Sequence, residues 1–155
     1  MSIIIRPYRD ADWPRLCAIH DAARQTELAL AGLPNAFLPL EIAAQREGLF
    51  SYTLRVAELD GQAAGFAAFT NDELAWLYVD PALARRGVGR ALVEHALTEM
   101  GRLVSIEVLS GNAPALALYE GCGFHRRKNL SGRMPGNEAF PVTVHVLELD
   151  RAGLG

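Results

Sequence analysis

The residues with the clearest chemical meaning lie at positions 85–90, in the run Arg-Arg-Gly-Val-Gly-Arg. An apolar stretch that ends at Asp80-Pro81 precedes this run, and apolar residues at helical spacing follow it. A turn between a strand and the start of a helix directs free backbone N–H groups and the positive end of the helix dipole at one point. Gly87 and Gly89 permit close approach to the backbone, and the three arginines add positive charge. The run therefore predicts a binding site for a phosphate or pyrophosphate group.

Two common nucleotide-binding motifs do not fit this turn. A Walker loop would continue with Lys and then Ser or Thr, and neither follows here. The dinucleotide fingerprint needs a third glycine where this chain has Leu92, and the turn comes after a hairpin and not in a first βαβ unit. ATP and NAD are therefore not favoured. An ordinary strand-to-helix turn with exposed arginines is the structural alternative.

A second segment with candidate chemistry runs from Glu107 to Phe124. Asn112 is placed to cap a helix that has Pro114 in its first turn. Tyr119 follows Asn112 by seven residues, which is two helical turns, so it faces the same way as the start of that helix. An N-cap and a half-buried packing tyrosine would explain both residues without a catalytic role.

The apolar periodicity predicts the elements that position these segments. Asp60-Gly61 favours a primed hairpin turn between two antiparallel strands, and residues 130–140, rich in Gly and Pro, are expected to form a loop. We expect strands at about 3–8, 51–59, 62–70, 74–79, 103–109, from 124 onward and at 141–149, and helices at about 12–31, 39–46, 88–100 and 112–121. The predicted order is β-α-α-β-β-β-α-β-α-β-β.

Composition limits the class of protein. The chain has 155 residues, of which 50% are hydrophobic and 21% charged, which indicates a single domain over residues 1–155 and excludes a disordered tail or a coiled coil. Cys17 and Cys122 show no pairing pattern and no zinc spacing, so we expect no metal and a reducing, cytoplasmic compartment. The apolar run Ile3-Ile4-Ile5 is too short for a signal peptide or a membrane span. A net charge of −3 argues against general nucleic-acid binding.

Four segments in this order resemble the GNAT family of acyl-CoA-dependent N-acetyltransferases. They are Val79-Asp80-Pro81, the turn at 85–90, the run from Glu107 to Asn112, and the run from Ala117 to Phe124. The resemblance implies an α/β (α+β) fold with a central mixed, mostly antiparallel sheet of about seven strands. That sheet is splayed between the fourth and fifth strands and flanked by four helices. The predicted order of elements is similar to this fold from end to end.

The resemblance also implies acetyl-CoA as the cofactor. Its pyrophosphate would rest on the turn, and its pantetheine arm would pair like an extra strand with the fourth strand, where a backbone N–H near Leu77 or Tyr78 would stabilise an oxyanion. Ala84 departs from the family pattern, which usually has Gln or Arg there, and this puts one side-chain contact in doubt. The coenzyme contacts implied are Leu77, Tyr78, Val79, Arg85, Arg86, Gly87, Val88, Gly89, Arg90, Asn112 and Tyr119.

The same resemblance suggests catalytic residues. Tyr119 is the candidate general acid for the departing thiolate, whose aqueous pKa should be about 8.5. Glu107 lies in an otherwise apolar strand, where burial would raise its pKa, and it matches the base of the GNAT enzymes that modify protein N-termini. A salt bridge from Glu107 to an arginine is its structural alternative. Glu73 matches a base position of other members but resembles part of a solvated turn. Cys122 is not proposed as a nucleophile.

The acceptor side carries less information. In similar proteins the two helices after the first strand and the last hairpin shape it, and the long insertion at 34–48 slightly favours a small acceptor. Residues 130–140 could serve as a lid or be an ordinary surface loop. Four charged or polar residues of the two helices could meet an acceptor's charges or form a solvated face: His20, Arg24, Glu27 and Glu41.

We therefore expect an acetyl-CoA-dependent N-acetyltransferase that acts on a primary amine of a small molecule, amino acid or peptide. The amine would attack the thioester directly, through a tetrahedral intermediate. A non-catalytic acyl-CoA-binding regulatory module is the alternative, and an ATP-binding domain is a more distant one. No nucleic-acid or membrane partner is expected, and exposed strand edges near the C-terminus leave room for a homodimer.

Overall fold

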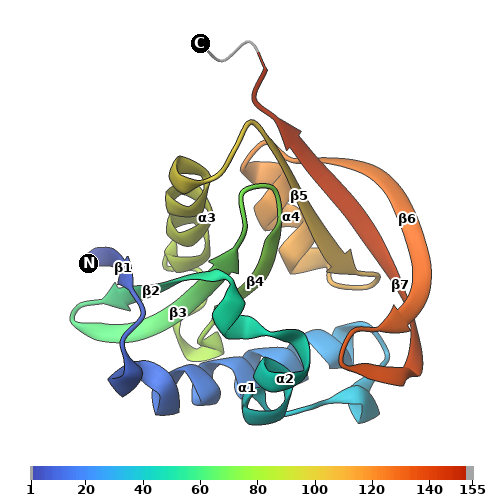
Figure 1. The fold of residues 1–155 in the computed structure, drawn as a ribbon, viewed down its shortest axis with the longest axis horizontal. Coiled ribbons are helices and arrows are strands. Elements are labelled where there is room, and N and C mark those ends of the chain that lie inside the picture. Colours follow the sequence, from blue (N-terminus) through green and yellow to red (C-terminus); the bar gives the residue numbers. More distant parts are fainter. Residues whose placement is uncertain (1, 153–155) are drawn as a thin grey trace.

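The computed structural model describes residues 2–152, and over this range the chain forms seven strands and four α-helices in the predicted order (Figure 1). The strands are β1 (Ile3–Pro7), β2 (Thr53–Leu59), β3 (Gln62–Phe69), β4 (Leu74–Val79), β5 (Leu103–Leu109), β6 (His125–Met134) and β7 (Asn137–Asp150). The helices are α1 (Trp13–Leu30), α2 (Leu40–Glu47), α3 (Val88–Glu99) and α4 (Ala113–Gly121).

The strands form two antiparallel sheets that separate between β4 and β5. The first sheet has the order β1-β2-β3-β4 and the second the order β5-β7-β6. A single parallel bridge between Glu73 and Ser105 joins them, and beyond it β4 and β5 diverge (Figure 1). The predicted seven strands and the splay between the fourth and fifth are confirmed, and the mixed sheet is in fact two sheets.

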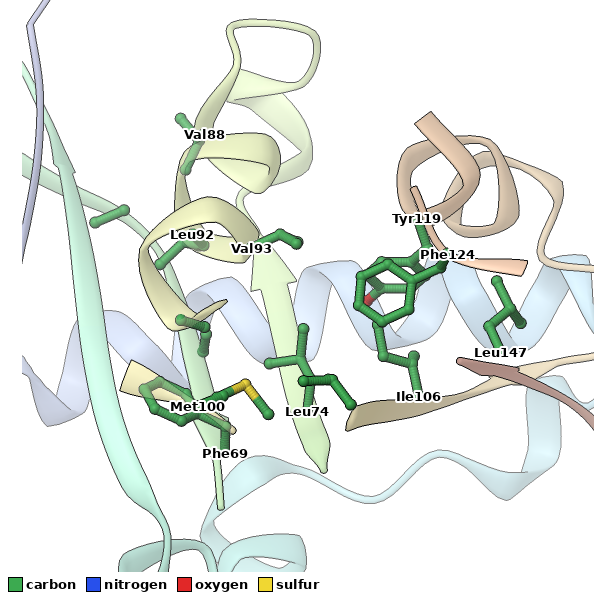
Figure 2. Packing of buried hydrophobic residues seen from close by; sticks show 14 of the residues in the cluster. Phe69, Leu74, Val88, Leu92, Val93, Met100, Ile106, Tyr119, Phe124 and Leu147 are labelled. Carbon is green, nitrogen blue, oxygen red and sulfur yellow. The ribbon is translucent and has the colours of Figure 1, made fainter. Parts of the chain in front are cut away.

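Helices cover both faces of the first sheet. On one face α3 packs Val88, Leu92 and Val93 into a core that continues to α4 and the second sheet (Figure 2). On the other face α1 and α2 pack Leu16 and Leu40 against the sheet. Because β3 is covered on both sides, its residues 64–69 are all buried, which explains its nearly continuous apolar sequence.

The hairpin between β2 and β3 turns where the sequence predicts. Asp60 and Gly61 both have positive φ angles, 51° and 87°, as a primed two-residue turn requires. Asp60 is one of two described residues other than glycine with a positive φ, and Asp tolerates this conformation better than most.

The expected loop at 130–140 is wrong. These residues belong to the long β6–β7 hairpin, with only Pro135-Gly136 between the strands. β6 is an edge strand exposed along nearly its whole length, so its sequence lacks the alternation that marks a half-buried strand. Pro141 is accommodated because β5 pairs with β7 only at 144–150, so one edge of β7 is free at Pro141.

The tip of this hairpin reaches α1 and α2 (Figure 1). Arg46 Nη1 donates to the Gly136 carbonyl at 2.9 Å, and Asn137 Nδ2 donates to the Ala36 carbonyl at 3.0 Å. Met134 is buried there and accepts a contact from Arg24 at 3.6 Å to its sulfur. The hairpin therefore covers one end of the gap between the two sheets.

In the described part of the chain, no helix combines the length and the apolar character needed to cross a membrane. The same residues contain no group of three or more His, Cys, Asp or Glu residues arranged to hold a metal ion. Cys17 and Cys122 are both free thiols.

Candidate active site

A cavity of about 910 Å³ lies between α1, the end of β4, the turn before α3, and α4. The turn takes its shape from Arg85 and Gly87, whose φ angles are 63° and 84°. Gly87 is the N-cap of α3 and brings no side chain to cap it. The first turn of α3 is therefore open toward the cavity.

The turn has the properties that a pyrophosphate group needs. Across residues 2–152, none of the recorded hydrogen bonds is donated by a backbone N–H of residues 85–90. Three arginine side chains of the turn are exposed, and one of them, Arg90, pairs with Glu94 at 2.9 Å. A Cβ atom on Gly89 would lie 3.2 Å from Leu118 Cδ2, so glycine also allows α3 and α4 to pack closely. Open donors and positive charge fit a bound anion.

One edge of β4 borders the same cavity. Past the Glu73–Ser105 bridge, this edge has no strand partner within the described residues. Ala75 is left unpaired by an irregularity in the β3–β4 register, which adds local twist to β4 just where the sheets part. The free edge at Leu77–Val79 can pair with an extended ligand chain.

A second cavity of about 170 Å³ meets the first one at four residues. Glu27, Leu77, Tyr78 and Tyr119 line both cavities. We call these four residues the junction and the second cavity the junction cavity. A group held along the β4 edge would reach a group entering from the other side at this point.

A hydrogen-bond network surrounds Glu27 in the junction. Its carboxylate accepts from Asn112 Nδ2 at 3.1 Å and from the Tyr78 hydroxyl at 3.4 Å, and it forms an ion pair with Arg24. Asn112 Oδ1 accepts from the backbone N–H of Ala115 at 3.3 Å, so the predicted N-cap is confirmed. Both ends of the Asn112 amide are thus engaged within the protein, and its contact with the coenzyme stays a prediction.

From the sequence, Arg24 and Glu27 could contact the acceptor or belong to a solvated helix face, and in the structure both line the cavities. The sequence contains a pattern that could have indicated this position of Arg24 and Glu27. Trp13, Leu16, Cys17, His20 and Ala23 share one face of α1, and steps of four residues from His20 and Ala23 lead to Arg24 and Glu27. The face of α1 that carries these residues therefore continues into this ion pair.

Tyr119 is buried, with 7% of its surface exposed, and it lies against Phe124 with 6.0 Å between ring centroids (Figure 2). Burial raises the pKa of its hydroxyl well above the usual value for tyrosine, and the nearby charge of Glu27 adds to this. The phenol therefore stays protonated at neutral pH and can act as a hydrogen-bond donor. The packing role and the predicted chemical role are both compatible with this position.

A third cavity of about 440 Å³ opens on the far side of the junction cavity. It contains both candidate bases and two further carboxylates. Its ionisable lining residues are Arg46, Glu47, Tyr52, Glu73, Glu107 and Glu138. Glu47 and Glu107 also line the junction cavity, so the two spaces are continuous at these residues. We call this space the acceptor cavity.

The expected burial of Glu107 is wrong. In β5, Val104, Ile106 and Val108 point into the core, and Glu107 lies on the opposite face, exposed toward the gap between the sheets. Throughout the described chain, Glu107 has no salt bridge to an arginine. Glu107 nevertheless lines the cavities, where a general base could act.

Glu73 differs from its expected solvated state. It is half-buried, and burial raises its pKa, with a further contribution from the negative charge of Glu107. The charge of Glu107 therefore acts on Glu73 across the splay.

Glu47, at the end of α2, was not among the predicted site residues. Burial raises the pKa of its carboxyl from 4.5 to about 7, with Arg24 opposing and Glu138 adding to the shift. The sequence offers no clear signal for this, because Glu47 comes just before the glycine that ends a short helix. Its position depends on the hairpin tip that folds over it.

His20 and Glu41, the other two candidates for contact with the acceptor, lie in different surroundings. His20 is buried in the junction cavity, where burial lowers its pKa, and its Nδ1 lies 2.9 Å from Asp21 Oδ1. Its ring also packs on Tyr78, with 4.8 Å between centroids. Glu41 is exposed on α2 and does not line any of the three cavities.

Comparison with known proteins agrees with this arrangement. Residues 13–124 match the acetyltransferase (GNAT) family. The peptidyl-lysine N-acetyltransferase YjaB of Salmonella typhimurium is 32% identical over 130 residues, covering 80% of this chain and 84% of that protein. The chain belongs to the acetyltransferase (GNAT) family.

Two further proteins add detail. The [ribosomal protein bS18]-alanine N-acetyltransferase of Escherichia coli strain K12 is 40% identical over 78 residues, which cover 43% of this chain. The matched stretch spans 53% of that relative, about half its length. The solved PaiA N-acetyltransferase from Thermoplasma acidophilum, in complex with coenzyme A, has a TM-score of 0.70 at 19% identity and covers 97% of this chain and 99% of its own. This last likeness shows the fold.

Proposed function

We propose that this protein is an acetyl-CoA-dependent N-acetyltransferase that acts on a primary amine. The observation that carries the proposal is the junction, where the cavity beside an anion-binding turn meets a separate cavity lined by carboxylates. Acetyl-CoA would supply an acetyl group activated as a thioester. Coenzyme A in the solved relative with the same fold supports this choice of ligand.

The chain's own groups can hold each part of this ligand. The open N–H groups at 85–90 and their arginines bind the pyrophosphate, and the free edge of β4 pairs with the pantetheine arm. A backbone N–H near Leu77 or Tyr78 donates to the thioester oxygen and stabilises the negative charge that develops there. These contacts align the thioester with the junction.

Tyr119 assists the leaving group. Its hydroxyl is protonated at neutral pH because burial raises its pKa. The thiolate leaving group has an aqueous pKa of about 8.5, so a hydrogen bond from a phenol is enough to stabilise it. Phenylalanine at this position would retain the packing against Phe124 and lose the donor.

Glu107 or Glu73 accepts the proton of the incoming ammonium. An amine attacks only after it loses this proton, and both carboxylates line the cavity from which it arrives. Glu107 also lines the junction cavity, so it lies nearer the reacting groups. The negative charge of Glu107 contributes to the raised pKa of Glu73 and so favours the protonated form of Glu73.

The acceptor is an amine on a peptide or a small molecule. The names of the two curated relatives, which describe a protein alanine and a peptidyl-lysine as acceptors, support an amine carried by a polypeptide. Both kinds of amine can enter the acceptor cavity, which lies below the tip of the β6–β7 hairpin.

The test is thermal unfolding with acetyl-CoA, coenzyme A, ATP and NAD in parallel, followed by detection of free thiol with a panel of amines. At ligand concentrations of about 100 times Kd, the proposal expects about 2.7 kcal/mol of stabilisation from acetyl-CoA and coenzyme A alone. Stabilisation by ATP alone would contradict the proposal. Stabilisation by coenzyme A with no thiol released from any amine would indicate the non-catalytic acyl-CoA-binding module.

A further inference from the structure

Glu47 lies on the wall of the acceptor cavity opposite the two candidate bases. It comes from the end of α2, whereas Glu73 and Glu107 come from the start of β4 and from β5. Glu138, two residues after the hairpin turn, lines the same wall and adds its negative charge to that of Glu47.

The carboxylates that line this cavity form no ion pair within the described residues. Nine of the 18 acidic side chains form ion pairs with arginines and three more accept hydrogen bonds, which leaves six in the described chain without a partner. Four of these six line the acceptor cavity: Glu47, Glu73, Glu107 and Glu138. Burying an unpaired carboxylate is unfavourable, so a group of opposite charge is expected beside Glu47.

Two arginines lie close to Glu47, and neither forms an ion pair with it. Arg24 is paired with Glu27, and Arg46, which lines the acceptor cavity, donates to the Gly136 carbonyl at 2.9 Å. Glu47 itself is held under the hairpin turn, because a Cβ atom on Gly136 would lie 3.4 Å from Glu47 Oε2 and 3.2 Å from its Cγ. Its carboxylate is therefore fixed in place without an internal partner.

The reacting amine cannot be the missing cation. It must be neutral when it attacks, so its charge is lost at the step that Glu73 and Glu107 serve. A counter-charge that persists through the reaction must be a separate group on the acceptor.

We propose that Glu47, supported by Glu138, binds a second positive charge on the acceptor, so that the preferred substrate is an amine carrying another cationic group a few bonds away. This proposal rests on the proposed acetyltransferase function. Glu47 acts as a specificity-determining residue, and the reaction itself does not pass through it.

The experiment compares two acceptors with the same carbon chain, lysine amide and norleucine amide, of which only lysine amide has an ε-ammonium group. Acetylation is followed at the α-amine, which both acceptors carry, with the product of lysine amide assigned by mass spectrometry. We expect kcat/KM for lysine amide to exceed that for norleucine amide by about 10- to 100-fold, the value of one hydrogen bond to a charged group. Glu47→Gln should reduce this ratio to within about threefold of unity, mainly by lowering kcat/KM for lysine amide. The matched control is Glu41→Gln, an exposed and unpaired residue of the same helix, which should leave the ratio unchanged.

Binding without turnover gives a second readout. Lysine amide alone should stabilise the unmodified protein against thermal unfolding more than norleucine amide does, and Glu47→Gln should abolish the difference. Equal kcat/KM and equal stabilisation by the two amides would overturn the proposal, as would a preference that survives in Glu47→Gln. If no amine of the panel, including the two amides, were acetylated although acetyl-CoA bound, the proposed function would fail, and the difference in stabilisation would still decide the role of Glu47.

Discussion

The carboxylate of Glu27 and the side-chain amide of Asn112 are 3.1 Å apart, although 85 residues separate them in the sequence. This hydrogen bond links α1 to the start of α4. It lies where the cavity beside the glycine turn meets the junction cavity. One side chain thus holds the two elements that border the expected thioester position.

Replacement of Glu27 by alanine tests this link. Arg24 and Asn112 would each lose a partner in a largely buried setting, so we expect a loss of about 1–3 kcal/mol in the free energy of unfolding. Urea denaturation measures this loss. As a control, Glu120→Gln breaks an exposed ion pair with Arg126 and should change stability by less than about 0.5 kcal/mol. A loss for Glu27→Ala no greater than that of the control would contradict the structural role of the network.

Gly111→Ala should destabilise the protein more than an ordinary surface substitution. Gly111 has a φ angle of 101°, and a Cβ atom there would lie 2.5 Å from the Leu30 carbonyl oxygen at the end of α1. The strain and the clash together should cost roughly 1–3 kcal/mol. Gly132→Ala, where a Cβ meets no atom within 4 Å and φ is not positive, is the matched control. Equal stabilities of the two variants would mean that α1 and the 111 turn do not pack as described.

The stability difference between the unmodified protein and Glu47→Gln should depend on pH. The folded-state pKa of Glu47 is about 7, above its ordinary value of 4.5, so the folded protein retains a proton that the unfolded chain has lost between these values. The unmodified protein therefore loses stability as pH rises through this range, and glutamine removes that loss. We expect the advantage of the variant to grow from near zero at about pH 4.5 to a plateau above about pH 7. Urea denaturation across this range checks this, and a constant difference would contradict it.

Glu107→Gln separates the roles of the two candidate bases. The charge of Glu107 contributes to the raised pKa of Glu73, so its removal should lower that pKa. If Glu73 takes the proton, the acid limb of the kcat/KM profile should move to lower pH, with activity retained. If Glu107 takes the proton, kcat should fall by about 10²- to 10⁴-fold. An unchanged rate and an unchanged profile would exclude both carboxylates from this step.

The sequence predicts the parts of the fold that depend on local patterns. The turn at Asp60-Gly61, the glycine turn before α3 and the cap at Asn112 each follow from residues that are adjacent in the chain. The family motifs supply the splay between β4 and β5, which no local pattern would indicate.

The sequence does not predict features that depend on distant contacts. The strand expected from 124 onward is confirmed, but its continuation to Met134 is not predicted, because that part of β6 is a strand through its pairing with β7 and its exposed residues carry no strand periodicity. Glu107 is exposed because the splay leaves one face of β5 uncovered, which cannot be seen from an apolar run. The helical spacing of α1 leads to Glu27, but its hydrogen bond to Asn112 forms only when α4 folds against α1. Glu47 enters the site only when the hairpin tip folds against α2.

The most direct test of the central claim is the release of coenzyme A thiol when acetyl-CoA is mixed with lysine amide, measured for the unmodified protein and for Tyr119→Phe. The proposed reaction predicts amine-dependent release that falls by about 10²-fold or more in the variant, while the affinity for coenzyme A changes by less than about threefold. No amine-dependent release from the unmodified protein, or equal release by Tyr119→Phe, would contradict acetyl transfer at this junction.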